Sequence, residues 1–174
     1  MNDLPEPALW KLRLERLEAE SAIRHVMAHY MRLCDRLDES TPLDELAALF
    51  TRDAVWAGRG SRYQALFGEH RGRGAIRKMF EGYQGPPPLF VLNAHFLTSE
   101  QIDTTTHPAS GRWMMLQTST YADGTSELRS ASLACRFMIE DDRWRICRFE
   151  TENRFARPID RWDVPPGQHE EQAG

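Results

Sequence analysis

The sequence has few of the features that mark a specialised class of protein. It contains only three cysteines, an odd number whose spacing matches no zinc or C-x-x-C motif. No stretch approaches the roughly 18 apolar residues of a membrane span. The net charge is −4 and no block of Lys and Arg offers a basic surface to a nucleic acid. The first residues lack the basic and apolar regions of a signal peptide. We therefore expect a cytoplasmic protein with reduced thiols and with neither a membrane span nor a nucleic-acid partner.

Motifs that would hold a cofactor are also scarce. Gly72 and Gly74 lack the rest of a dinucleotide-binding fingerprint. His25 and His29, four residues apart, could in principle contact a metal ion, but no third ligand is evident nearby. We expect no cofactor and no metal site.

The overall composition is that of an ordinary globular domain. Of the 174 residues, 41% are hydrophobic and 28% are charged. This length suits one domain with its own core. We assign residues 1–163 to a single domain, and we expect residues 164–174, which include two prolines and several polar side chains, to form a flexible tail.

The N-terminal half has a helical pattern. Apolar residues recur every three or four positions from Trp10 to Leu37, which predicts a long helix with one buried stripe. Its charged first turns could stand off from the core. Two shorter helices are expected over residues 43–50 and 75–83. Thr41 can cap the first of them, and Pro42 suits its first helical position.

The C-terminal half is dominated by strand patterns. A short strand over 54–57 and an extended segment over 59–71 precede the Gly-Pro-Pro-Pro break at residues 85–88. Four long strands follow, over 89–104, 112–121, 127–139 and 144–155. Helices first and strands after them favour an α+β fold. We expect a mostly antiparallel, strongly curved sheet that forms a cone-shaped α+β barrel around the long helix and leaves a pocket between them.

Several segments, in order, resemble the SnoaL-like branch of the nuclear transport factor 2-like superfamily over residues 17–155. The segments are the helix at 22–35 with its Tyr and Asp, the stretches 50–56 and 72–76, the strand at 93–97 with a central His, and the W-x-I pattern at 144–146. Members of this family include scytalone dehydratase, bile-acid 7α-dehydratase and hexachlorocyclohexane dehydrochlorinase.

The resemblance implies roles for three residues. His95 would remove a proton from carbon, Asp35 from the first helix would orient His95, and Tyr30 would donate a hydrogen bond to an oxygen. Asp35 lies five residues after Tyr30, about 140° around an ideal helix, so the two cannot share one narrow face. Asp38 lies nearer the face of Tyr30 and is a second candidate for the carboxylate.

The strands supply further candidates for the pocket wall. The expected substrate-binding residues are Trp56, Phe96, Met115, Gln117, Phe149 and Asn153. Strict alternation on the last strand places Phe149 and Asn153 on one face, with Ile146 and Arg148 on the other. Dehydrochlorinase-like members have an Arg near the position of Phe149, so its apolar side chain argues against a charged leaving group such as chloride. The strand after His95 offers Gln117 and Ser119, not the Asp or second His that the dehydratases have there.

These expectations favour a cofactor-independent lyase or isomerase of the dehydratase kind. His95 and Asp35 would act on a small, mostly apolar, cyclic substrate. The alternative is a non-catalytic binding module or a partner subunit, such as a β-like subunit of a ring-hydroxylating dioxygenase. By family analogy we expect a homodimer or a higher homo-oligomer.

Overall fold

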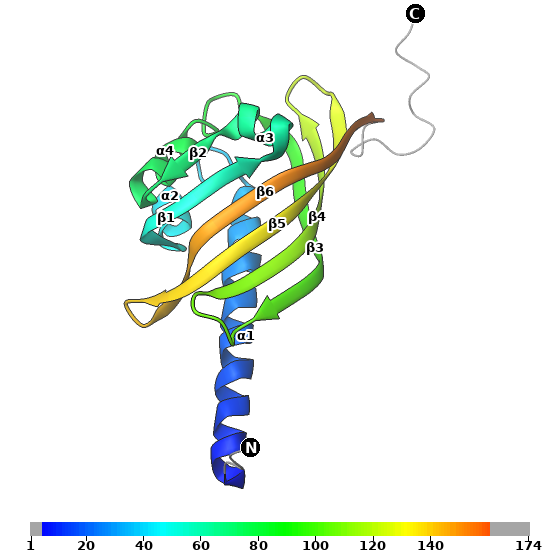
Figure 1. Ribbon diagram of the computed structural model, residues 1–174. Coiled ribbons are helices and arrows are strands. Elements are labelled where there is room, and N and C mark those ends of the chain that lie inside the picture. Colours follow the sequence, from blue (N-terminus) through cyan, green and yellow to red (C-terminus); the bar gives the residue numbers. More distant parts are fainter. Residues whose placement is uncertain (1–4, 161–174) are drawn as a thin grey trace, which may run out of the picture.

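The computed structural model describes residues 5–160 and shows one long helix, three short helices and a curved sheet (Figure 1). The elements in chain order are α1 (Glu6–Cys34), α2 (Leu43–Ala48), β1 (Phe50–Arg59), α3 (Gly60–Phe67), β2 (Glu69–Arg71), α4 (Arg73–Glu81), β3 (Phe90–Asp103), β4 (Ala109–Tyr121), β5 (Ser126–Glu140) and β6 (Arg143–Ile159). The predicted tail at 164–174 lies outside the described residues. Within 5–160, no helix combines the length and apolarity needed to cross a membrane.

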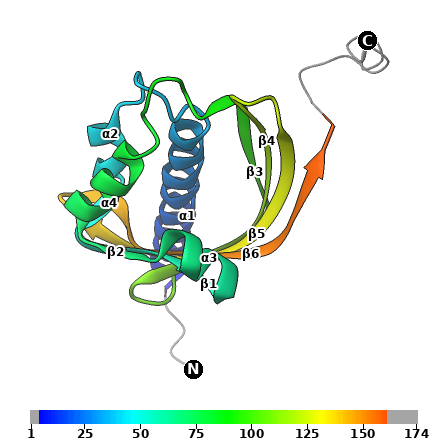
Figure 2. The same cartoon turned by 90° about the horizontal axis from the view of Figure 1, so that it is seen from above.

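The sheet has six strands in the order β2-β1-β6-β5-β4-β3. All neighbouring pairs are antiparallel except β1 and β6, which run parallel. Figure 2 shows the sheet curving around α1, with β2 and β3 as separate edges. The α+β prediction and the curved, mostly antiparallel sheet are confirmed. The sheet is an open cone and does not close into a barrel.

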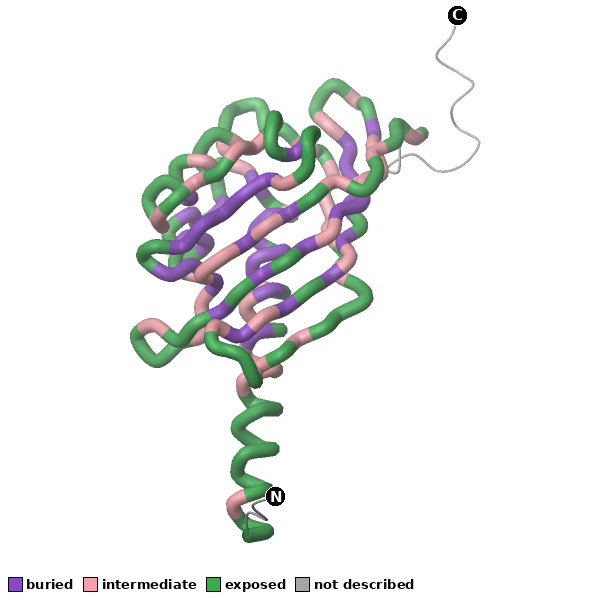
Figure 3. The backbone as a smooth tube through the Cα atoms, in the orientation of Figure 1, coloured by how far each residue is buried: buried purple, intermediate pink, exposed green. Residues whose placement is uncertain are grey.

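Helix α1 has two parts with different surroundings. Ile23, Met27 and Tyr30 are almost fully buried against the sheet. Trp10 and Leu17, by contrast, are 57% and 60% exposed, on turns that project beyond the sheet (Figures 1 and 3). The prediction of one buried stripe beginning at Trp10 is therefore wrong. Six residues separate Leu17 from Ile23, which is about 240° around a helix, so the two apolar groups lie on different faces.

The predicted extended segment over 59–71 is also wrong. It contains helix α3, followed by the short strand β2. Tyr63 and Phe67 are one helical turn apart, and Phe67 packs edge-on against Trp56 with ring centroids 5.5 Å apart. Gly58 has no side chain, which allows the backbone of Tyr63 to approach β1 closely. The sequence pattern missed this helix because three apolar residues over five positions fit either period.

A β-bulge changes which side chains of β6 face inward. The pairing of β5 with β6 shifts between Arg136 and Phe137, so that one extra residue of β6 enters the ladder. As a result Ile146 and Phe149 are both buried, at 0% and 2% exposure. The predicted alternation, which placed Ile146 on the face of Arg148, is wrong at this point.

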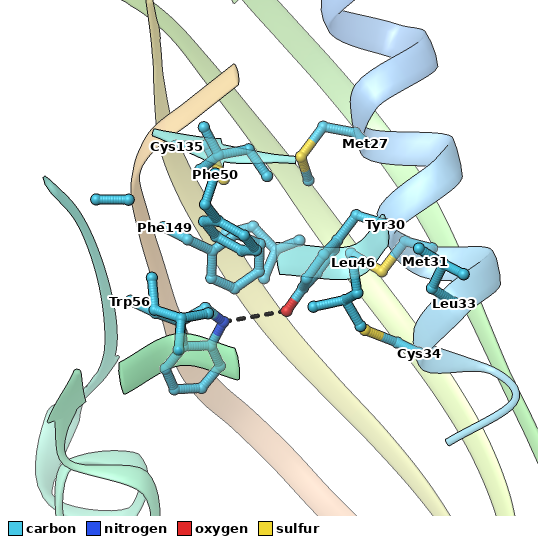
Figure 4. Packing of buried hydrophobic residues seen from close by; sticks show 14 of the residues in the cluster. Met27, Tyr30, Met31, Leu33, Cys34, Leu46, Phe50, Trp56, Cys135 and Phe149 are labelled. Carbon is cyan, nitrogen blue, oxygen red and sulfur yellow. Dashed lines mark hydrogen bonds between the residues drawn. The ribbon is translucent and has the colours of Figure 1, made fainter. Parts of the chain in front are cut away.

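The core lies between the second half of α1, the short helices and the inner face of the sheet. Its largest fully buried side chains include Met27, Leu46, Phe50, Ile76 and Phe137. Figure 4 shows part of this cluster around Tyr30. Burying each such side chain contributes about 1.5–3 kcal/mol. The core therefore anchors the part of α1 that borders the cavity described next.

Candidate active site

A cavity of about 270 Å³ lies between the end of α1 and the inner face of the sheet. Its wall is mostly apolar and aromatic, with a few polar groups. The residues discussed below that line it are Tyr30, Trp56, His95, Gln117, Arg129 and Phe149. A mostly apolar cavity with a few converging polar groups is typical of a small-molecule site.

His95 and Asp35 contact each other at this cavity. The Nδ1 atom of His95 lies 2.7 Å from Oδ1 of Asp35, and the backbone N–H of His95 donates to the same oxygen at 2.9 Å. An ionised carboxylate can only accept a hydrogen bond, so Nδ1 must carry the proton. In the neutral ring this leaves the lone pair on Nε2, for which no hydrogen-bond partner is found within residues 5–160. The contact with Asp35 thus fixes the tautomer and the orientation of the His95 ring.

Asp35 rather than Asp38 is therefore the carboxylate beside His95. Asp38 accepts hydrogen bonds from the backbone N–H and hydroxyl of Ser40, at 2.8 and 2.6 Å, which lower the pKa of its carboxyl. Asp35 caps the C-terminus of α1 and reaches β3. Asp35 contacts His95 and is not itself part of the cavity wall, so it does not need to share a helix face with Tyr30.

Tyr30 enters the cavity from the buried part of α1. Its hydroxyl accepts a hydrogen bond from Trp56 Nε1 at 3.0 Å (Figure 4). Burial raises the pKa of Tyr30 well above its usual value, as does the neighbouring Cys34 thiol. The phenol therefore stays protonated, and its hydrogen can be donated to the Cys34 sulfur or to an oxygen bound in the cavity.

An amide network occupies the wall beside His95. The side-chain nitrogen of Asn93 donates to the Cys34 carbonyl at 3.0 Å. The Asn93 oxygen accepts from Gln117 and from Ser119, both at 2.8 Å. These bonds hold the Gln117 amide in one orientation and use its N–H group. No hydrogen-bond partner for the Gln117 oxygen is found among the described side chains and backbone, so this acceptor is available to a ligand.

Arg129 is a cavity residue that the sequence reasoning missed. The Phe149 position on β6 is apolar, as expected, but the neighbouring strand β5 brings a guanidinium to the same cavity. Leu133 is buried on the inner face of β5, and counting back from it in steps of two reaches Arg129. That alternation was the available signal. The argument from the apolar Phe149 position is therefore incomplete, because Arg129 brings a guanidinium to the cavity from another strand.

The other predicted wall residues divide into two groups. Trp56, Met115 and Phe149 line the cavity. Phe96 is 53% exposed and outside the cavity wall, because it alternates with the inward His95 on β3. Asn153 also lies outside the wall, beside a second irregularity of β6, and its side chain donates to the Phe155 carbonyl at 3.1 Å. The expected positions of these last two residues are wrong.

The two histidines of α1 have separate partners. His25 contacts the Ser21 carbonyl at 2.9 Å, and His29 contacts the Glu45 carboxylate at 2.7 Å. Over the described part of the chain, no three His, Cys, Asp or Glu side chains are grouped as a metal site would require.

Comparison with known families agrees with this geometry. The model of the SnoaL-like domain matches residues 15–150. The chain belongs to the SnoaL-like family. Its fold is accordingly the cone of the nuclear transport factor 2-like superfamily. A search of curated proteins found no match.

Solved structures share the fold at low sequence identity. The type 3 hexachlorocyclohexane dehydrochlorinase LinA from Novosphingobium barchaimii superposes with a TM-score of 0.70 at 18% identity, covering 88% of this chain and 99% of that one. A scytalone dehydratase-like protein from Novosphingobium aromaticivorans superposes with a TM-score of 0.67 at 20% identity, covering 86% of this chain and 97% of that one. An aromatic ring hydroxylase-like protein from the same species superposes with a TM-score of 0.69 at 19% identity, covering 82% of this chain and 94% of that one. At these identities the likeness shows the fold.

Proposed function

We propose that this SnoaL-like protein is a cofactor-independent lyase or isomerase of the dehydratase kind. The observation that carries the proposal is the 2.7 Å contact between His95 and Asp35 at the wall of an apolar cavity. A histidine oriented by a carboxylate is a suitable base near neutral pH.

In the proposed reaction, Nε2 of His95 removes a proton from a carbon of the substrate. The C–H bond breaks, its electrons pass into the substrate, and the imidazolium that forms is stabilised by Asp35. Tyr30 donates a hydrogen bond to the oxygen that gains charge. In a dehydration, the C–O bond to a hydroxyl group then breaks, and the departing oxygen takes the proton now held by His95 and leaves as water. In an isomerisation, the proton returns to a different carbon.

The cavity favours a small cyclic substrate. Its volume of about 270 Å³ lies near the lower end of the usual range for ligand sites, about 300–1,000 Å³. Trp56 stacks on Phe149 with an interplanar angle of 12° and ring centroids 5.6 Å apart, so the wall presents flat aromatic surfaces. A molecule of one or two rings suits both the size and the chemistry of this wall.

The structural neighbours support the same class of reaction. Two of them are named for elimination chemistry, as a dehydrochlorinase and as a scytalone dehydratase-like protein. We carry this over to the present chain as a lyase-like activity, and the identity of the substrate stays a prediction.

The second candidate is a binding module or a partner subunit without activity of its own. Gln117 and Ser119 stand beside His95 in place of a second acid, which favours this alternative. The aromatic ring hydroxylase-like neighbour is consistent with a subunit role. Such a protein would bind cyclic ligands in the cavity and would not exchange their protons.

Proton exchange into deuterated water separates the two candidates. Cyclic ketones and enones of one or two rings are incubated with the protein, and loss of their α-proton signals is followed by NMR. We expect exchange by the wild-type protein and a reduction of about 10²-fold or more in His95→Gln, because no base remains. Asp35→Asn should also be slower, since the ring loses the partner that orients it.

His25→Gln is the matched control, because His25 is an exposed histidine that contacts only the Ser21 carbonyl among the described residues. It should exchange at the wild-type rate. Full exchange activity in folded His95→Gln would contradict the proposed base. Ligand binding without any exchange across the panel would favour the binding module.

Two further expectations remain proposals. By family analogy we propose a homodimer or a higher homo-oligomer, which sedimentation at several protein concentrations would test. We also propose a cytoplasmic location, in keeping with three cysteines that are all free in the structure.

A further inference from the structure

We propose that Arg129, held by Glu127, forms a subsite for an uncharged oxygen of the substrate, such as a carbonyl or a hydroxyl group. The inference deepens the proposed function by naming a feature of the substrate. It rests on the proposed function only in assuming that the bound molecule is a substrate. The subsite itself can be tested by ligand binding, without any reaction.

The first argument is the position of Arg129 in the sheet. In the ladder of β3 and β4, His95 is directly opposite Gln117, and in the ladder of β4 and β5, Gln117 is directly opposite Arg129. All three side chains line the cavity. Neighbouring strands are about 4.8 Å apart, so the backbones of His95 and Arg129 are separated by about 10 Å. A one- or two-ring molecule with an oxygen opposite its reacting carbon would span this row.

The second argument is the state of the guanidinium group. Its Nε donates to Oε2 of Glu127 at 2.5 Å, and the hydroxyl of Tyr121 donates to the same oxygen at 3.2 Å. The arginine side chain is 21% exposed and that of the glutamate 16%. Within residues 5–160, no hydrogen-bond partner is found for either Nη atom of Arg129. A guanidinium has five N–H donors in a fixed plane, so its Nη groups can still donate to a bound oxygen.

The third argument is charge. Glu127 neutralises Arg129 at close range, and Asp35 adds a negative charge near the other end of the row. Arg62 approaches Glu127 only at 3.9 Å, and its side chain is 54% exposed to solvent. A carboxylate ligand would lose its hydration here without gaining a net positive partner, which is unfavourable. A carbonyl or hydroxyl oxygen can accept the Nη hydrogen bonds without that cost.

The experiment compares three bicyclic probes of similar size that differ in the oxygen group they carry. These are tetralin, which has no oxygen, 1-tetralone, which has a ketone, and 1-naphthoate, which has a carboxylate. Dissociation constants are measured by calorimetry, supported by the fluorescence of the wall residue Trp56. We expect wild-type protein to bind 1-tetralone about tenfold more tightly than tetralin, and to bind 1-naphthoate the most weakly.

The variants assign this preference to the subsite. Arg129→Met should lose the preference for 1-tetralone and keep the affinity for tetralin, while Arg129→Lys should retain part of it. Glu127→Gln should improve the binding of 1-naphthoate, because Arg129 is then no longer neutralised. Arg136→Met is the matched control, since Arg136 is an exposed residue of the same strand. The ratios of its dissociation constants for the three probes should equal those of the wild-type protein.

Two results would overturn the subsite. One is an unchanged ratio of 1-tetralone to tetralin in folded Arg129→Met. The other is a wild-type preference for 1-naphthoate. Neither measurement depends on turnover, so failure of the subsite is distinguishable from failure of His95 as a base, which is read from proton exchange alone.

Discussion

The two halves of α1 have similar apolar content and opposite surroundings. Leu14 and Leu17 on the projecting turns are more than half exposed, whereas Ile23 and Met27 are almost fully buried (Figure 3). Both groups show the spacing of three or four residues that is typical of a buried helix face. This spacing therefore identifies a helix, but the extent of the sheet determines which turns of that helix are buried in the core.

The buried half also leads to the cavity. Tyr30 and Asp35 come from the last turns of α1, where β1, β3 and β6 surround the helix. The projecting half offers charged and apolar groups to solvent and contributes nothing to the cavity wall. Substitutions in the buried half should therefore affect both stability and the cavity, whereas those in the projecting half should have only small effects on stability.

The largest expected effect is on the buried half. Met27→Ala removes a side chain that is 1% exposed and leaves a cavity in the core. We expect a loss of about 2–5 kcal/mol in the free energy of unfolding, measured by urea denaturation. A loss below about 0.5 kcal/mol would show that the packing around α1 is much looser than the burial indicates.

A smaller effect is expected from pH. Burial raises the pKa of the Cys34 thiol from its ordinary value of 9.0 to about 12. Above pH 9 the unfolded chain releases a proton that the folded chain retains, so stability falls as pH rises. By pH 10 the resulting loss in the free energy of unfolding is on the order of 1 kcal/mol.

The check is urea denaturation of wild-type protein and Cys34→Ala at pH 7.5 and pH 10. The variant should lose less stability between the two values. Equal losses would mean that Cys34 is not the thiol that matters, and that another buried group such as Cys135, whose pKa burial also raises, accounts for the dependence.

The smallest effect is expected on the projecting half. Leu17→Ala changes a side chain that is already 60% exposed, and alanine is a good helix former. The free energy of unfolding should change by less than about 0.5 kcal/mol. A loss near that of Met27→Ala, measured at the same protein concentration, would show that the projecting turns are covered in solution, and dilution would then show whether a second copy covers them.

Parts of the site could be predicted because they depend on local pattern and on resemblance. His95 lies at the centre of a regular strand, so its inward direction follows from alternation with Phe96. The same rule, applied to β3, should have placed Phe96 outside. The sequence does not distinguish Asp35 from Asp38, because the rotation of a helix end does not follow from the spacing of residues alone.

Other features depended on events that no local pattern records. The bulge on β6 moved Ile146 to the inner face and took the strand out of strict alternation. Helix α3 formed where Gly58 let the chain turn back onto β1. The bulge depends on how β6 pairs with β5, and the helix depends on how closely its backbone packs against β1.

The amino-acid sequence thus determined the order of most elements, the α+β class and the family, since these follow from periodicity, turn residues and motif order. The tertiary structure decided which carboxylate meets His95, which turns of α1 are covered, and that Arg129 joins His95 and Gln117 in one row across the sheet. The physical reason is that strand register and sheet curvature bring distant residues together. They are set by the packing of the whole domain rather than by neighbours along the chain.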